Sequence, residues 1–142
     1  MIAINESVIL DAIENIIESD LTVRSFNPEI VRTEVINSDS SRSRWVCVVP
    51  GELSYYPVGS NMGFRYDPIV FVQAITHMTG RQTEIELNNL VSAIINAIDR
   101  DKGLNNTVAH ILGYNVAKSF NTKNESQFKQ EAIITISCEG RL

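Results

Sequence analysis

The residues that most often do chemistry in proteins are few and widely spaced in this sequence. Its histidines are His77 and His110, and its cysteines, Cys47 and Cys138, each lie in an apolar run. Neither histidine belongs to a His-Glu-x-x-His motif, and no Cys-x-x-Cys pair occurs. A zinc site needs several such ligands at close spacing. The pattern therefore predicts two buried reduced thiols and two structural or surface histidines, and we expect no metal and no cofactor.

Two short segments approach the motifs of ligand-binding loops without completing them. In Val58–Gly63, Ser60 follows Gly59 directly, which breaks the Gly-x-Ser-x-Gly pattern, and no Gly-Lys-Ser/Thr follows as in a phosphate-binding loop. The run Asp99–Gly103 lacks the third acidic position of a calcium loop. Triads that combine Ser60 or Cys47 with a histidine and an aspartate can be written for any chain of this size. We expect no catalytic residues and no enzyme activity.

Length and composition indicate a single soluble domain spanning residues 1–142. A chain of 142 residues can bury one core, and its hydrophobic fraction of 44% and charged fraction of 20% are ordinary for a globular protein. No apolar run approaches the ~20 residues of a membrane span. The first basic residue is Arg24, which argues against a targeting signal. We expect synthesis in a cytosol and no membrane contact.

The net charge of −5 is concentrated at the N-terminus. Residues 1–21 hold five acids and no base, whereas the rest of the chain holds twelve of each. The five acids are Glu6, Asp11, Glu14, Glu18 and Asp20. An acidic chain without clustered bases is poorly suited to binding nucleic-acid phosphates. We interpret the acids as a solvated helix face, with an electrostatic docking surface as the alternative.

Two segments have the periodicity of amphipathic helices. Over residues 5–18, apolar side chains recur at helical spacing behind Asn5, a suitable N-cap. The second helix is predicted from a capping box at Thr83 and Glu86 and ends before Gly103. Its apolar stripe consists of Leu87, Leu90, Val91, Ile94, Ile95 and Ile98.

The remaining apolar segments are short and read as extended strands between polar connections. They lie at 21–26, 29–36, 45–49, 69–78, 109–120 and 130–140. The connections are predicted at 37–44, 50–68 and 121–129, the first two as long loops. No internal repeat or strand–helix–strand alternation is visible. We therefore predict an α+β fold, with a mostly antiparallel or mixed sheet of about four to five strands and two main helices packed on one face.

The segment 50–68 is the most unusual part of the sequence. It contains three prolines, three glycines, three tyrosines, a phenylalanine and a methionine. Aromatic residues, methionine and arginine are enriched at protein interfaces, so we predict a docking loop, although some of these side chains can instead fold back over the sheet. The predicted interface residues are Tyr55, Tyr56, Met62, Phe64, Arg65 and Tyr66, with Arg42 and Arg44 from the preceding serine-rich segment.

The order of these elements resembles the tail-terminator or tail-completion proteins of long-tailed bacteriophages, together with related neck proteins. The resemblance is carried by the N-terminal helix "ESVILDAIENII", by the strand "PIVFVQAITHMTG" that runs into the helix "TEIELNNLVSAIINAI", and by the C-terminal "QEAIITISCEGRL". It spans nearly the whole chain and rests on element order, length and pattern.

The resemblance implies a structural virion protein of the tail or neck, assembled in the host cytoplasm. Six copies would form a ring that caps the tail tube, stops its polymerisation and offers a docking surface to the head. The implied partners are further copies of the chain, the tail tube protein and a neck or head-completion protein. DNA would pass through the lumen without specific binding. By position, the contacts would map to 37–44, 50–68 and 121–129.

Three other functions stay open at the level of sequence. One is a head-completion or neck adaptor protein of the same fold. Another is a small hydrolase or transferase that uses 50–68 as a lid. The third is a small-ligand module whose aromatic residues line a pocket.

Overall fold

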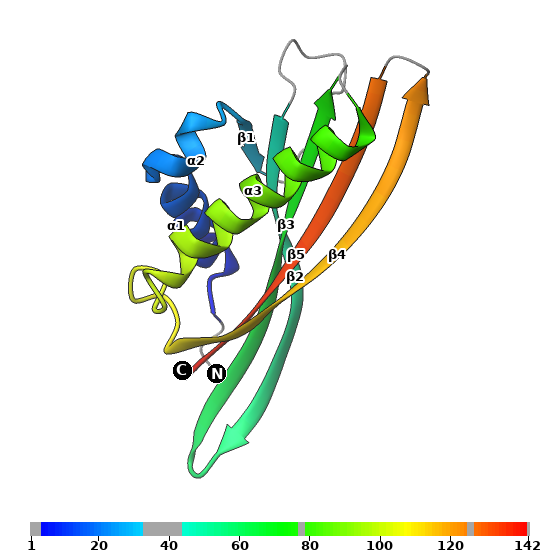
Figure 1. Cartoon of the computed structure of the whole chain (residues 1–142). Coiled ribbons are helices and arrows are strands. Elements are labelled where there is room, and N and C mark those ends of the chain that lie inside the picture. The colour runs from blue at the N-terminus through cyan, green and yellow to red at the C-terminus, as the bar shows by residue number, and fades with distance from the viewer. Residues whose placement is uncertain (1–3, 33–43, 77–78, 125–126, 142) are drawn as a thin grey trace.

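The computed structural model describes residues 4–32, 44–76, 79–124 and 127–141. The elements are α1 (Glu6–Ser19), α2 (Leu21–Ser25), β1 (Glu29–Arg32), β2 (Arg44–Val58), β3 (Asn61–Thr76), α3 (Gly80–Asp99), β4 (His110–Asn124) and β5 (Gln127–Arg141). The strands form one sheet in the order β1-β2-β3-β5-β4, in which β1 is parallel to β2 and the other neighbours are antiparallel. The helices lie on one face of this sheet (Figure 1). The predicted α+β fold with a mixed sheet is confirmed.

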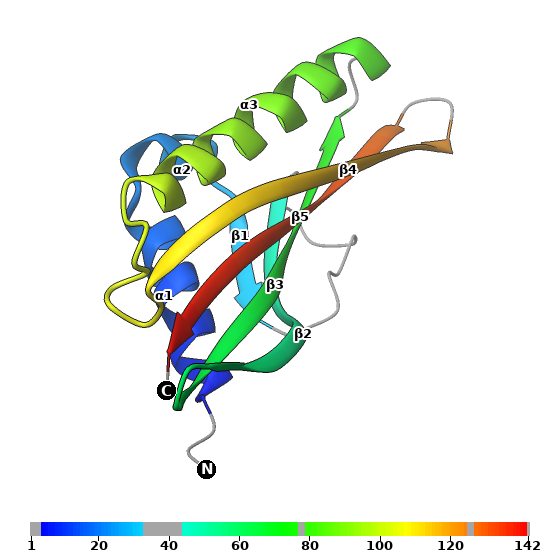
Figure 2. The ribbon, with the colours of Figure 1, turned by 90° about the horizontal axis from the view of Figure 1, so that it is seen from below.

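Helices α1 and α3 cover different strands of the sheet. Helix α1 contacts β1 and β2, and α3 contacts β3 and β5. Figure 2 shows the helices together on one side of the sheet. The sheet residues beneath α3 meet in register, with Val70 opposite Ile134 and Val72 opposite Ala132. All four side chains are at most 1% exposed, so this is the centre of the core. No helix in the described ranges is long and apolar enough to cross a membrane.

Helix α1 begins where the sequence predicted. The side chain of Asn5 accepts a hydrogen bond from the backbone N–H of Ser7 at 3.1 Å and so caps the helix. Its buried face consists of Ile9, Leu10, Ala12, Ile13 and Ile17. On the exposed side, Arg32 of β1 pairs with Asp11 and Glu14. These ion pairs join α1 to the first strand.

The extended conformation predicted for 21–26 is wrong, because these residues form α2. Asp20 accepts a hydrogen bond from the backbone N–H of Val23 at 3.0 Å, which satisfies a donor in the first turn. The side chain of Val23 is fully buried against the core. The cap and this burial together outweigh the β-propensity of the short segment.

Helix α3 starts three residues before the predicted capping box. Thr79 is the N-cap, and its hydroxyl accepts a hydrogen bond from the backbone N–H of Gln82 at 3.0 Å. Thr83 lies inside the first turn, fully buried, and donates to the Thr79 carbonyl at 2.8 Å. The capping box at Thr83 and Glu86 is therefore wrong, and Glu86 instead pairs with Arg44. The predicted apolar stripe is confirmed, since its members are buried or packed against the core.

The cap at Thr79 leads to a testable expectation. Thr79→Ala removes the acceptor for Gln82 while keeping the carbonyl that Thr83 uses, so we expect a loss of about 1 kcal/mol in the free energy of unfolding. Urea unfolding followed by circular dichroism measures this, and Thr79→Ser is the control that keeps the hydroxyl. Equal stability of the alanine variant and the parent would contradict the assigned helix start.

The loop predicted at 50–68 is wrong, because the segment is a β-hairpin. Strand β2 continues to Val58 and β3 begins at Asn61, with a turn at Gly59, where φ is +60°. A register shift between Val49 and Glu52 takes up the Pro50-Gly51 pair. Proline is tolerated at bulges and on strand edges, so it bends this strand without ending it.

The other two predicted connections are also altered. Strand β4 reaches Asn124 and β5 begins at Gln127, so most of 121–129 is paired strand. Of the loop predicted at 37–44, only Arg44 lies within the described residues, and it is the first residue of β2. Cys47 and Cys138 are both buried thiols, as predicted.

Candidate protein-interaction surface

The hairpin of β2 and β3 carries most of the predicted interface residues and divides them between two faces. Tyr55 lies opposite Phe64, and Leu53 lies opposite Tyr66, on the face toward the helices. Phe64 is 3% exposed and Tyr66 is fully buried. Because successive side chains of a strand point to opposite faces, Tyr56 and Arg65 lie on the other side. The prediction that Phe64 and Tyr66 are surface contacts is therefore wrong, since both belong to the core.

Arg42 and Arg44 were both predicted as interface residues, but only Arg44 can be placed. Arg42 lies outside the described residues. Arg44 makes an ion pair with Glu86 of α3 at 2.8 Å, donates to the carbonyl of Phe26 at 3.0 Å and lies over the Phe26 ring at 5.9 Å. These contacts join β2 to α3 and to the end of α2, so in the described structure Arg44 makes its contacts within the subunit. Met62, beside the hairpin turn, is half-buried.

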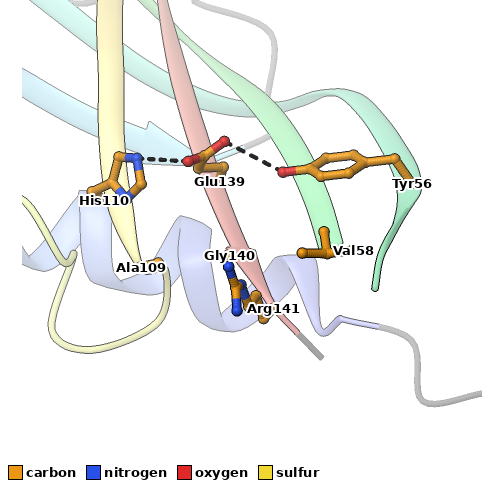
Figure 3. A pocket seen from close by; sticks show the side chains of 7 residues that line it. All are labelled: Tyr56, Val58, Ala109, His110, Glu139, Gly140 and Arg141. Atoms are coloured by element: carbon orange, nitrogen blue, oxygen red, sulfur yellow. Dashed lines mark hydrogen bonds and ion pairs between the residues drawn. The ribbon is translucent and has the colours of Figure 1, made fainter. Parts of the chain in front are cut away.

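The face away from the helices holds a polar cluster that the sequence did not predict (Figure 3). Glu139 of β5 lies between His110 of β4 and Tyr56 of β2: His110 Nε2 is 2.6 Å from one carboxylate oxygen, and the Tyr56 hydroxyl donates to the other at 3.3 Å. Arg141 lines the same hollow, whose volume is about 380 Å³. The cluster joins three strands at one end of the sheet.

A glycine makes room for this arrangement. Gly63 of β3 lies opposite Tyr56, and a Cβ atom there would come within 2.8 Å of the Tyr56 ring. The ring therefore lies across the bare backbone of β3 and reaches Glu139 on β5 (Figure 3). Partial burial and the negative charge of Glu139 raise the pKa of Tyr56, while Arg141 and Arg65 oppose this shift. The phenol is thus protonated at neutral pH and acts as the donor.

The cluster lacks the serine, threonine or cysteine nucleophile of a triad-type hydrolase. The hollow is lined by Tyr56, Val58, Ala109, His110, Glu139, Gly140 and Arg141. None of these is a serine, threonine or cysteine that could act as a nucleophile. Cys47 is 2% exposed and pairs with Phe71 in the middle of the sheet, away from the His110–Glu139 pair. A lid at 50–68 is excluded because that segment is paired in the sheet.

No metal centre is formed by the described residues, and the predicted aromatics do not gather around one pocket. They contain no group of three or more histidine, cysteine, aspartate or glutamate side chains placed to hold an ion. Among the predicted aromatics, Tyr56 lines the hollow, whereas Phe64 and Tyr66 contribute to the core. What the arrangement offers chemically is hydrogen bonding and charge on an open surface, which suits a contact with another macromolecule.

The same face also carries an apolar centre. Cys47, Phe71, Ile133 and Ala117 follow one another across four strands, and Ile133 is 37% exposed. No helix of the described chain covers this face (Figure 1). This side of the sheet therefore has an apolar middle, in which Cys47 is buried and Ile133 is exposed, and the polar cluster at one end.

The architecture is a two-layer α+β fold, one helix layer on one mixed sheet. No protein family model and no curated protein matches the sequence. A chain in the solved structure described as the virion of a native gene transfer agent (GTA) particle does match by fold, with a TM-score of 0.58 and 13% sequence identity. The match covers 92% of this chain and 94% of that one. At this identity the likeness is one of fold.

Proposed function

We propose that this chain is a structural virion protein that forms a ring at the head-proximal end of a phage or phage-like tail. The observation that carries the proposal is the match to a chain of a virion, which extends over 92% of this chain and 94% of the other. Because nearly all of both chains is aligned, they share a complete subunit fold and not only a common supersecondary fragment.

The finer assignment rests on the sequence resemblance to tail terminators. In this role, six copies would end polymerisation of the tail tube and present a docking surface to the neck. The predicted partners are the chain itself, the tail tube protein and a neck or head-completion protein. A net charge of −5 suits a ring through which DNA passes without being held. The role requires neither catalysis nor a cofactor.

A head-completion or neck adaptor protein is the second candidate. The matching structure is described as a virion, and that description gives no position within the particle. A neck component of this fold would equally be a ring with two docking faces. The experiment below separates the two candidates.

Deleting the gene from the particle that encodes this chain tests the proposal. If the chain terminates tails, electron micrographs should show free heads together with tails of uncontrolled length, and expression in trans should restore normal particles. A neck adaptor would instead leave tails of normal length that fail to join heads. Normal particles after deletion would refute both.

A further inference from the structure

The sheet has two different edges, and β4 is the longer of them. Strand β4 spans His110–Asn124 and pairs on one side with β5; within the described ranges no strand pairs with its other side. Natural proteins usually block a long open edge, because its backbone N–H and C=O groups can pair with another chain. Two lysines and register shifts near both ends of β4 discourage unspecific pairing, so a partner of this edge should carry complementary charge.

The opposite edge is only partly covered. Strand β1, Glu29–Arg32, covers β2 from Trp45 to Val48. Beyond that point β2 carries Pro50 and Pro57, which lack the backbone N–H that a further strand would need. Strand β4 contains no proline. Among the described strands, the edges without a partner are thus β4 on one side of the subunit, and β1 with the part of β2 beyond Val48 on the other.

The two sides carry opposite charge. The acidic side, defined here as Glu6–Arg32 with α1, α2 and β1, contains six acids and two bases. Strand β4 contains two lysines and no acid. Lys118 reaches Asn88 of α3 yet stays exposed. A β4–β4 pair between two copies would bring four lysines and no acid together. This like charge disfavours a symmetric β4–β4 dimer.

Exposed apolar side chains are also found on both sides. Leu112 sits at a register shift in β4, and its side chain is 48% exposed. On the acidic side, Leu21 of α2 is 78% exposed. Each side therefore offers an apolar contact beside its charges and strand edge.

From these observations we infer that the β4 edge binds the acidic side of a second copy, with β4 pairing against β1 of that copy. Each subunit then uses one edge of each kind. Such a head-to-tail contact can close into a ring, because it joins two different patches of the same chain. The inference rests on the proposed ring and names the surfaces that form it.

Hydrogen exchange of the full chain, compared between the monomer and rings assembled on tail tubes, tests the strand pairing. Ring formation should slow exchange of amides in 29–32, and in a stretch of similar length within 110–119, by about tenfold or more, since newly paired amides are protected. Amides of the central strand β3 serve as the internal control and should change little.

A charge reversal provides the second measurement. Lys118→Glu should weaken ring association by about tenfold, equivalent to about 1.4 kcal/mol. Arg81→Glu, at an exposed position in the first turn of α3, is the matched control and should leave association unchanged. Circular dichroism and thermal unfolding check that both variants fold.

The outcomes separate this inference from the proposed function. Rings in which 110–119 exchanges as in the monomer, or rings unaffected by Lys118→Glu, would overturn the edge contact and leave the proposed function standing. Protection of 110–119 by tube protein alone, without ring formation, would assign the edge to that partner and overturn the inference. A chain that forms no ring on tubes would refute both.

Discussion

Replacing Tyr66 with alanine is expected to lower the free energy of unfolding by about 3–5 kcal/mol, the largest effect of a single substitution that we predict. Tyr66 is fully buried, between Leu53 on β2 and Cys138 on β5, beneath the helix layer. Removing the ring leaves a cavity that the surrounding strands cannot fill without breaking their register. Urea unfolding followed by circular dichroism measures the loss.

Tyr56→Ala is the matched control for this prediction. Tyr56 lies ten positions earlier in the same hairpin but on the opposite face, half-buried, with one hydrogen bond to Glu139. We expect its replacement to cost much less than that of Tyr66, because a partly exposed hydrogen bond contributes little. If the two substitutions cost the same, the assignment of the two faces of the hairpin would be wrong.

The second large effect is a loss of stability in alkaline solution. Burial raises the pKa of Cys138 to about 12 and that of Tyr66 to about 12, and burial together with Asp99 raises the pKa of Tyr114. These groups stay protonated in the folded chain at pH values where they ionise in the unfolded chain. The folded state therefore binds more protons, and stability falls as the pH rises through this window.

Urea unfolding at pH 8, 9, 10 and 11 checks this expectation. Stability should be nearly constant up to pH 9 and then fall, with a loss on the order of a few kcal/mol by pH 11. Cys138→Ala should lower stability at pH 8 because it leaves a cavity, yet make the alkaline slope shallower because it removes one ionising group. Stability that is flat or rises above pH 9 would show that these groups are not buried as described.

The helical half of the fold could be predicted from the sequence because its signals are local. The apolar stripe of α3 and the Asn5 cap of α1 each lie within a few turns of chain. Helix α2 also has a local signal, the Asp20 cap. The β-branched residues around it favour a strand, and for that reason the helix was not predicted. Reading Asp20 as a helix cap would have found it.

The hairpin is hard to predict from sequence because proline and glycine usually break strands. Pro50 falls at a register shift, and Pro57 falls close to the turn on an open edge. The alternation of Leu53 with Tyr55, and of Phe64 with Tyr66, was the available signal for strands, since each pair has the period of two of a half-buried sheet.

The polar cluster could not be predicted from sequence by any local rule. His110 meets Glu139 because β4 and β5 pair in a particular register, and that register includes a shift between Ile111 and Gly113. A displacement of one residue would place the two side chains on opposite faces of the sheet. Only the three-dimensional pairing brings them together.

We propose that this chain is a ring component at the head end of a tail. The most direct measurement is to locate it in intact particles, by electron microscopy of virions whose copy of this chain carries a gold-labelled tag. Label should be confined to the junction of tail and head. Label along the tail, over the head surface or absent from the particle would contradict it.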